Sequence, residues 1–250
     1  MPIEIEAVSV ANDLGTVVHD VSNPLDNPAW HALKDLQARQ GESSARAARF
    51  APDISPIGAL LEPTRDALEE LFVLCGREPV VLLTPVRELP RSRFRTLRIV
   101  QVRQLCAESA CDADDVHASL LGNDDAADMV ALATLTEPGP FARRTVELGT
   151  YYGVRDGGRL LAMAGERLKL PGWVEVSGVC THPDGRGRGY ARRLVARITN
   201  AIIARGDAAF LHVAVGSPSE TTATRVYEQL GYRFRHELYV HALMYDGKAP

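Results

Sequence analysis

The chain has 250 residues, of which 46% are hydrophobic, and a formal net charge of −4. This length accommodates one large domain or two small ones with a substantial core. The slightly acidic net charge argues against nucleic-acid binding, which needs a clustered basic face. The sequence contains no run of about 18 apolar residues, so it predicts no membrane span. The start of the chain lacks the basic and apolar segments of a secretory signal, so we expect a cytoplasmic protein.

The first part of the chain predicts a small α/β unit. Asn27 followed by Pro28 is typical of a helix start, and Thr64 and Gly76 are typical of the two ends of a second helix. The predicted elements are, in order, a helix over 27–40, a helix over 64–75 and a short buried strand over 79–84. The polar segment 86–95 contains a proline and is the best candidate for a linker.

The second part of the chain alternates strand and helix patterns. A hairpin turns around Gly157 and Gly158, and Gly178 interrupts a strand, which indicates a bulge or the close approach of another group. The predicted elements are a strand over 96–105, a helix over 125–137, two hairpin strands within 150–168, a strand over 173–183, a helix ending at Arg205, a strand over 209–215, a helix over 221–231 and one or two strands over 232–245.

The segment HPDGRGRGYARRLVARI, residues 182–198, joins a strand end, a glycine-rich turn and an amphipathic helix. Unpaired N–H groups at a helix start bind anions such as phosphate, and glycines let the backbone approach the anion closely. A P-loop is excluded because no lysine lies between Lys169 and Lys248. A dinucleotide-binding fold is excluded because a hairpin precedes the turn and the next strand ends without an acidic residue.

Arg186, Gly189 and Ala191 match the signature Q/R-x-x-G-x-G/A, and the chain around them resembles the GNAT superfamily of N-acetyltransferases, most clearly over 147–245. The resemblance implies the GNAT acyl-CoA N-acyltransferase fold, an α/β (α+β) fold with a mixed, mostly antiparallel sheet and flanking helices. In that family the loop holds the pyrophosphate of acetyl-CoA, and a splayed strand before it binds the pantetheine arm. The implied cofactor-binding residues are Val179, Cys180, Thr181, Arg186, Gly187, Arg188, Gly189, Tyr190 and Ala191.

Two further residues match catalytic positions of the family. Glu175 lies where a subset of members carries a general base, and an alkylamine must lose a proton before it attacks a thioester. We expect partial burial to raise the pKa of Glu175; the alternative is a solvated residue on the polar face of a strand. Tyr227 matches the tyrosine of the pattern A-x-x-x-Y-E-x-x-G-F. It would protonate the leaving thiolate, or else it is a packing residue.

Three other features are interpreted as structural. Glu220 stands where many members carry an asparagine, and we interpret Ser217 to Glu220 as a capping box with Pro218 at the first helical position. We expect His212 to be a strand residue with a satisfied ring. The cysteines and histidines show no metal-binding spacing, so we predict buried thiols in a reducing compartment and no metal site.

The candidate linker divides the chain into two domains. Residues 94–250 form the acetyltransferase domain that the resemblance implies. Residues 1–93 form an N-terminal α/β unit that matches no family by its motifs, and it is either a degenerate half of the same fold or a lid. An acetyl group would pass from acetyl-CoA to a primary amine by direct attack, with an N–H of Val179 or Cys180 polarising the carbonyl group. Cys180 is not expected to act as a nucleophile, because nothing nearby in sequence would activate it.

Other points stay open in the sequence. The alternative function is a CoA or acyl-CoA sensor that has lost its chemistry and signals through the N-terminal unit. The acceptor is a small molecule or a protein. Asp124, Asp125 and Asp128 either attract a cationic amine or simply begin a helix. The last strand could pair with a second copy of the chain to give a homo-oligomer.

Overall fold

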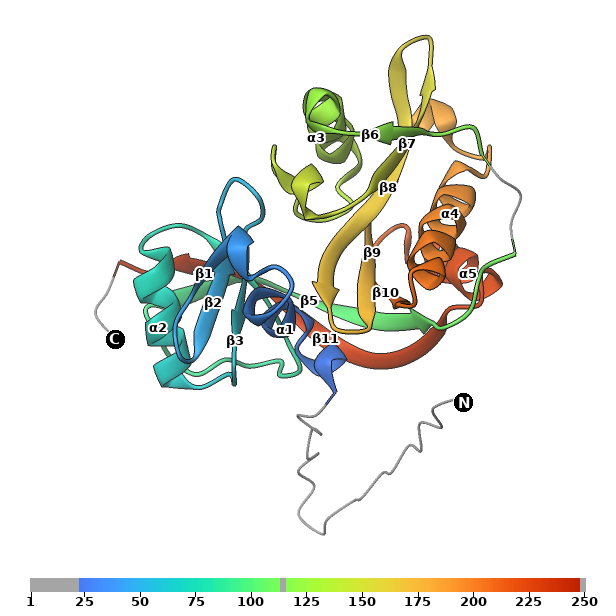
Figure 1. Ribbon diagram of the computed structural model, residues 1–250. Coiled ribbons are helices and arrows are strands. Elements are labelled where there is room, and N and C mark those ends of the chain that lie inside the picture. The colour runs from blue at the N-terminus through green and yellow to red at the C-terminus, as the bar shows by residue number, and fades with distance from the viewer. Residues whose placement is uncertain (1–22, 113–115, 248–250) are drawn as a thin grey trace.

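The computed structural model describes residues 23–112 and 116–247 (Figure 1). The segment at the start of the chain, on which the expectation about a secretory signal rests, lies outside these residues. The N-terminal half contains α1 (Pro28–Lys34), β1 (Gly41–Ser43), β2 (Ala47–Phe50), β3 (Ile57–Leu60), α2 (Arg65–Cys75) and β4 (Val80–Thr84). The C-terminal half contains β5 (Phe94–Ala107), β6 (Ser119–Leu121), α3 (Ala126–Thr136), β7 (Tyr151–Asp156), β8 (Arg159–Leu170), β9 (Trp173–Thr181), α4 (Tyr190–Ala204), β10 (Ala208–Ala214), α5 (Glu220–Gln229) and β11 (Arg233–Tyr245).

The strands of the described residues form one mixed sheet in the order β1-β2-β3-β4-β11-β5-β10-β9-β8-β7-β6. The pairs β3–β4 and β9–β10 are parallel and the other neighbours are antiparallel. The predicted fold class, a mostly antiparallel mixed sheet with flanking helices, is therefore confirmed. Figure 1 shows the two long strands β5, in green, and β11, in red, running side by side between the two halves.

The two halves repeat one topology. In each, an antiparallel strand pair is followed by a helix and a parallel strand, β2-β3-α2-β4 in the first half and β8-β9-α4-β10 in the second. The strands after these units are exchanged: β5 pairs with β10, whereas β11 pairs with β4. The N-terminal half of the sheet is thus completed by β11, the last strand of the chain.

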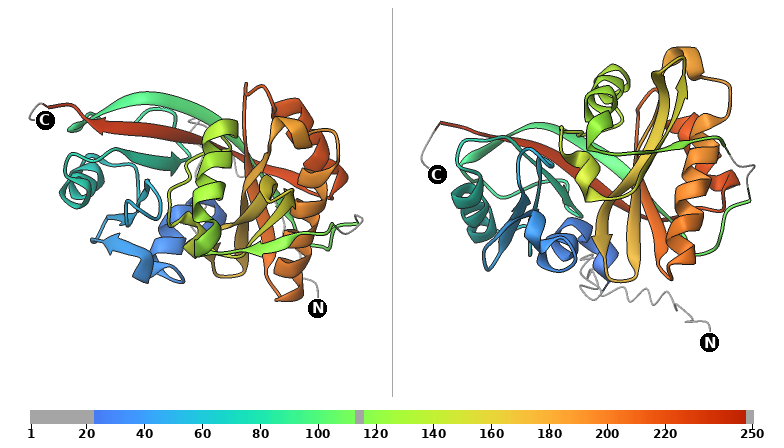
Figure 2. Two further views of the ribbon diagram at one scale, coloured as in Figure 1. Left: turned by 90° about the horizontal axis from the view of Figure 1, so that it is seen from above. Right: turned by 45° about the horizontal axis from the view of Figure 1, so that its top comes forward.

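Helices cover both faces of the C-terminal half of the sheet, as the turned views in Figure 2 show. The apolar stripe of α4 packs against one face, where Leu194, Val195 and Ile202 have no exposed surface. Residues of α3 pack on the opposite face with Tyr151 and Met163. Because both faces are covered, the strands between them are shielded from water, and polar groups placed there must find partners within the protein.

Several predicted elements are confirmed, and the differences have local causes. α2 has the predicted Thr64 cap, whose hydroxyl accepts the N–H of Ala67, and β4 lies where the apolar run predicted it. The first helix is shorter than predicted and ends at Lys34, because Gln37 turns its side chain into the protein, where it bonds to the backbone of β8. Strands β1, β2, β3 and β6 were not predicted, and β11 is a single bulged strand.

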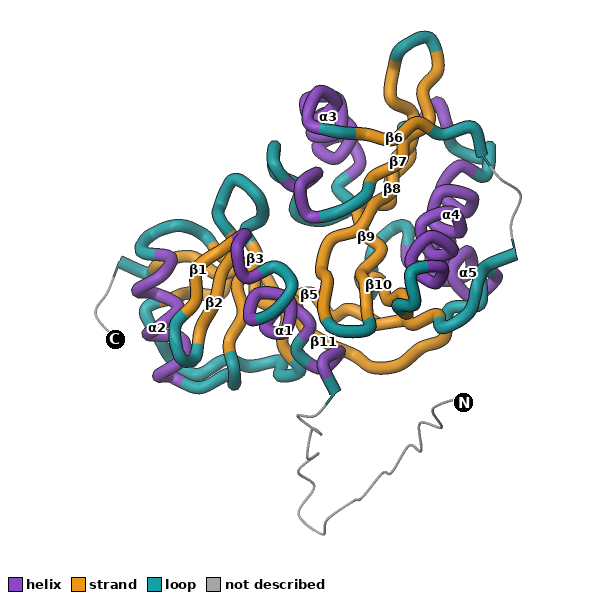
Figure 3. The backbone as a smooth tube through the Cα atoms, in the orientation of Figure 1, coloured by secondary structure: helices purple, strands orange, loops and turns teal. Residues whose placement is uncertain are grey.

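The capping box predicted at Ser217 is wrong. α5 begins at Glu220 with Ser219 as its N-cap, and the Glu220 carboxylate accepts the N–H of Gly216 instead. The tube representation in Figure 3 shows how short this helix is beside α4. Among the described residues no helix is long and apolar enough to cross a membrane.

Candidate active site

The glycine-rich turn between β9 and α4 offers a row of unpaired backbone N–H groups. Gly187 and Gly189 have φ values of 75° and 70°, in the left-handed region that other residues avoid. The first backbone bond of the helix start runs from the N–H of Arg193 to the oxygen of Gly189. Within the described residues, no protein acceptor lies on the N–H groups of residues 187–192, and Arg186 and Arg188 are exposed beside them. The turn therefore has the backbone geometry that anion sites use.

Strands β9 and β10 separate just before this turn. They pair in parallel only from Trp173 to Glu175, although β9 continues to Thr181. Gly178, with φ 62°, lies in a bulge where β9 has one residue more than β8. The predicted splay and bulge are present, so the β10-facing edge of Val179, Cys180 and Thr181 is free of strand pairing.

A small pocket of about 70 Å³ opens where the two strands separate. It is lined by Pro138, Arg167, Glu175, Val176, Ser177, Gly178, Val179, Leu211, His212 and Tyr227. The structure thus brings together the two predicted catalytic residues, Glu175 from β9 and Tyr227 from α5, with Val179 of the predicted cofactor edge. The remaining cofactor candidates lie along the same edge and in the anion-binding turn.

Glu175 is fully buried and is held by two partners. Arg167, from the adjacent strand β8, donates Nε to Oε2 at 2.8 Å and Nη2 to Oε1 at 2.7 Å. His212, from β10, places Nδ1 2.8 Å from Oε1. The expectation of a raised pKa is wrong: burial does favour the neutral acid, but the charge and hydrogen bonds of Arg167, helped by His212, lower the pKa of Glu175 to about 2. The solvated alternative is wrong too, because the residue has no exposed surface.

The ring of His212 is satisfied on both sides, as predicted. The amide oxygen of Gln104 accepts a bond from Arg235, which leaves its Nε2 as a donor to the oxygen of Leu25 and to His212 Nε2 at 3.2 Å. The imidazole therefore accepts at Nε2 and donates from Nδ1 to Glu175. This chain of bonds ties the site to the N-terminal half.

Tyr227 and Cys180 differ in what they offer the pocket. Burial raises the pKa of the Tyr227 phenol to about 12, so it stays protonated at neutral pH and available as a donor. Burial also raises the pKa of the Cys180 thiol to about 11. A thiol is a weak nucleophile, which agrees with the expectation that Cys180 does not attack.

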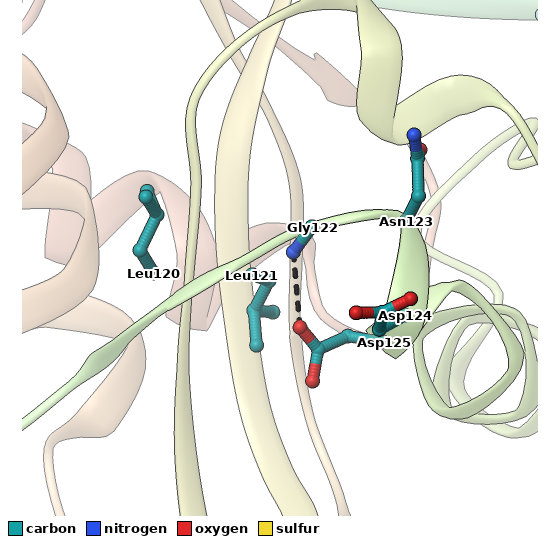
Figure 4. A pocket seen from close by; sticks show the side chains of 6 residues that line it. All are labelled: Leu120, Leu121, Gly122, Asn123, Asp124 and Asp125. Carbon is teal, nitrogen blue, oxygen red and sulfur yellow. Dashed lines mark hydrogen bonds between the residues drawn. The ribbon is translucent and has the colours of Figure 1, made fainter.

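A second hollow lies away from this pocket, at the end of β6. Figure 4 shows Leu120 to Asp125 around it, with Asp125 accepting the N–H of Gly122. Asp125 and Asp128 both pair with Arg155, at 2.6 Å and 2.7 Å. Both carboxylates are therefore held by one guanidinium of the protein, and for Asp125 and Asp128 the contacts favour the simpler interpretation, the start of a helix.

Sequence reasoning missed Arg167 and Gln37. At Arg167 β8 gains a residue relative to β9, and the side chain of Gln37 fills the gap by bonding to the oxygen of Arg167 and the N–H of Lys169. No local pattern marks either residue. The one available signal was the presence of Arg167 in the hairpin strand that directly precedes the strand of Glu175.

Comparisons with known proteins point to one family. Residues 151–240 match the family model of FR47-like proteins. A crystal structure described as an acetyltransferase from the GNAT family of Novosphingobium aromaticivorans is 35% identical, with 90% of this chain and 99% of that chain aligned at a TM-score of 0.80. No curated protein matches.

Two more distant structures share the fold. A GCN5-related N-acetyltransferase from Kribbella flavida is 16% identical over 88% of this chain and 95% of that chain, with a TM-score of 0.58. A GCN5-related N-acetyltransferase-like protein from Streptococcus suis is 16% identical over 86% and 93%, with a TM-score of 0.53. All three alignments extend well beyond the C-terminal half.

Proposed function

Because this chain belongs to the GNAT family of acetyltransferases, we propose that it transfers an acetyl group from acetyl-CoA to an amine by direct attack. The observation that carries the proposal is the juxtaposition of an unpaired anion-binding turn and a splayed strand edge with a polar pocket at its inner end. Acetyl-CoA would supply an activated thioester. The residues present fit it, because diphosphate needs the unpaired N–H groups that residues 187–192 offer.

The edge of β9 orients the reacting group. Val179, Cys180 and Thr181 would pair with the pantetheine arm as a strand pairs with its neighbour. The N–H of Val179 or Cys180 would donate to the carbonyl oxygen, and a donor of this kind contributes about 3 kcal/mol to transition-state stabilisation. The Tyr227 hydroxyl, which burial keeps protonated at neutral pH, would give its proton to the leaving sulfur and take one back from water.

Glu175 takes a different part from the one the sequence suggested. A carboxylate with a pKa near 2 holds a transferred proton poorly, and proton acceptors work best with a pKa near the working pH. We propose that Glu175 fixes the guanidinium of Arg167 in the pocket. The amine would then enter neutral, and its second proton would pass to water at the mouth of the pocket.

The N-terminal half supports this site. We propose residues 1–93 as a unit that braces residues 94–250, because Gln37 clamps the backbone at Arg167 and Leu25 accepts from Gln104 behind His212. Its repeated topology suggests a degenerate half of the same fold. The β3–α2 turn has no glycine, and Thr64 already occupies the N–H of Ala67, so we propose one CoA site per chain.

The four cysteines are all unpaired, which supports a reducing compartment such as the cytoplasm as the place of action.

The ion pair of Glu175 with Arg167 also supports the alternative function, a CoA sensor without chemistry. In this pair Glu175 cannot serve as the general base that the sequence suggested. Turnover separates the two functions.

The deciding experiment measures CoA release from acetyl-CoA with a panel of amines, alongside calorimetry of CoA binding. We expect binding and turnover in the wild type and at least a tenfold lower kcat in Tyr227→Phe. Tyr232→Phe removes a buried hydroxyl bonded to Thr199 outside the pocket and is the matched control. Binding without turnover for every amine would favour the sensor, and absence of binding would refute the CoA site itself.

A further inference from the structure

Arg167 presents an unused edge to the pocket. Its Nε and Nη2 atoms hold Glu175 along one side of the planar guanidinium. An arginine has five N–H donors in a fixed fork, so both donors of Nη1 and one of Nη2 remain. Within the described residues no acceptor lies on Nη1, and the side chain is 15% exposed, with Arg167 among the residues that line the pocket.

Arg167 lies on the side of the pocket away from the glycine-rich turn. Along β9, Glu175 and its partner Arg167 lie beyond the Gly178 bulge, on the side away from the anion-binding turn. The cofactor would approach from the turn along Val179. The space beside Arg167 is therefore left for the group that attacks.

Another arginine of this chain, Arg144, shows what the remaining donors of an arginine bind when one carboxylate already occupies Nε and Nη2. Arg144 holds Glu147 through Nε and Nη2, both at 2.8 Å, and its Nη1 donates to a second carboxylate, that of Asp53, at 2.8 Å. Arg167 makes the first of these two interactions with Glu175 and lacks the second. A carboxylate supplied from outside would complete the arrangement. The other polar side chains that line the pocket belong to Ser177, His212 and Tyr227, and Glu175 is the one acidic residue among the lining residues.

We propose that the free edge of Arg167 binds a carboxylate of the acceptor, so that the acceptor is an amine with a carboxylate close by, as in a free amino acid. This inference rests on the proposed acetyltransferase function. The carboxylate at Arg167 would leave the amine one or two bonds away, facing the strand edge at Val179. Glu175 keeps the fork in its plane, so the carboxylate and the amine are fixed relative to each other.

The test compares amino acids with their amides, for example leucine with leucinamide and glycine with glycinamide. Rates of CoA release are compared at equal concentrations of the neutral amine, because the amides have less basic amines. We expect the acid to be preferred at least tenfold in kcat/KM. The preference should fall to below threefold in Arg167→Lys, which keeps the charge without the fork, and in the double variant Arg167→Gln with Glu175→Gln. Arg144→Gln, which removes the surface arginine that binds two carboxylates, should leave it unchanged.

A second readout does not depend on turnover. In the complex with CoA, calorimetry should detect leucine binding to the wild type and at least tenfold weaker binding to Arg167→Lys, with CoA affinity unchanged in both. Equal rates for acids and amides, or an equal loss for both in the variants, would overturn the proposal. CoA and leucine binding without turnover would refute the enzyme function and leave the carboxylate site standing.

Discussion

Arg167 and Glu175 form a buried two-point ion pair between neighbouring strands, with the planes of the guanidinium and the carboxylate joined at 2.8 Å and 2.7 Å. Both groups belong to the pocket, and both come from strands with an irregular register. The pairing turns a glutamate that resembles a general base into the anchor of a cation. The charge that lines the pocket therefore depends on where Arg167 is held.

The first prediction concerns the energy of this pair. Glu175→Gln leaves a buried guanidinium without its counter-charge, so we expect the free energy of unfolding to fall by about 3–5 kcal/mol. The double variant Arg167→Gln with Glu175→Gln should lose less than the sum of the two single variants, because no charge is left uncompensated. Urea denaturation of the four proteins gives the cycle. Strictly additive losses would mean that the two groups do not interact.

The second prediction concerns acid stability. Glu175 has a pKa of about 2 in the folded protein, below the usual value of about 4.5 for a glutamate. A depressed folded-state pKa gives stability that is complete above the unfolded pKa and is lost as the pH falls through the folded pKa. We therefore expect stability to decline between about pH 4.5 and 2. The decline should be shallower in the double variant lacking both charges, and an identical slope would contradict the pKa assignment.

The third prediction concerns the pH dependence of the rate. If the amine enters neutral, kcat/KM should rise with pH toward the pKa of the amine and follow it from one amine to the next. A base on the enzyme with a raised pKa would instead add a fixed inflection between pH 5 and 7 for every amine. Rates with two amines of different basicity separate these cases. A fixed inflection that disappears in Glu175→Gln would restore Glu175 as the base.

A feature could be predicted from the sequence where all the residues that determine it lie in one continuous segment. The glycine-rich turn, the Gly178 bulge and α4 lie within one stretch of the chain, and their conformations follow from local backbone geometry. The family pattern A-x-x-x-Y-E-x-x-G-F identified Tyr227 in the sequence, and in the structure this residue lines the pocket.

Contacts between segments that are far apart along the chain could not be predicted from the sequence. Nothing local to Glu175 reveals Arg167 on the previous strand, because a bulge in β8 decides which of its residues turns toward β9. The pKa expectation failed for this reason: burial was foreseen, but the counter-charge was not. The exchange of β5 and β11 likewise depends on pairings across more than a hundred residues, which no window of sequence contains.

The fourth prediction concerns Gln37, which holds the backbone at Arg167. Gln37→Ala would leave the oxygen of Arg167 and the N–H of Lys169 without partners, and each unsatisfied buried group costs about 1–3 kcal/mol. We expect lower stability and a kcat at least fivefold lower, with unchanged CoA affinity. Gln40→Ala removes an exposed bond to Glu147 from the same segment and serves as the control. Unaltered kcat in Gln37→Ala would refute the bracing role of the N-terminal half.

The fifth prediction concerns the bulge that opens the strand edge. Gly178 has φ 62°, and a Cβ there would lie 3.1 Å from the ring of Tyr151, which is fully buried and cannot retreat easily. Gly172, in the turn between β8 and β9, has φ 75° and nothing within 4 Å of such a Cβ. Alanine at either position meets the same backbone cost, about 1–2 kcal/mol in the left-handed region. Only Gly178→Ala adds the contact with Tyr151.

The two variants therefore separate strain from site geometry. We expect Gly172→Ala to lose stability while keeping its affinity for acetyl-CoA. Gly178→Ala should lose more stability and bind acetyl-CoA at least tenfold more weakly, because the Tyr151 ring resists the new methyl group and the edge from Val179 to Thr181 must shift. Calorimetry with acetyl-CoA on both folded variants measures the difference. Equal affinities would show that the bulge does not shape the edge, and the strand would then lose its assigned part in binding.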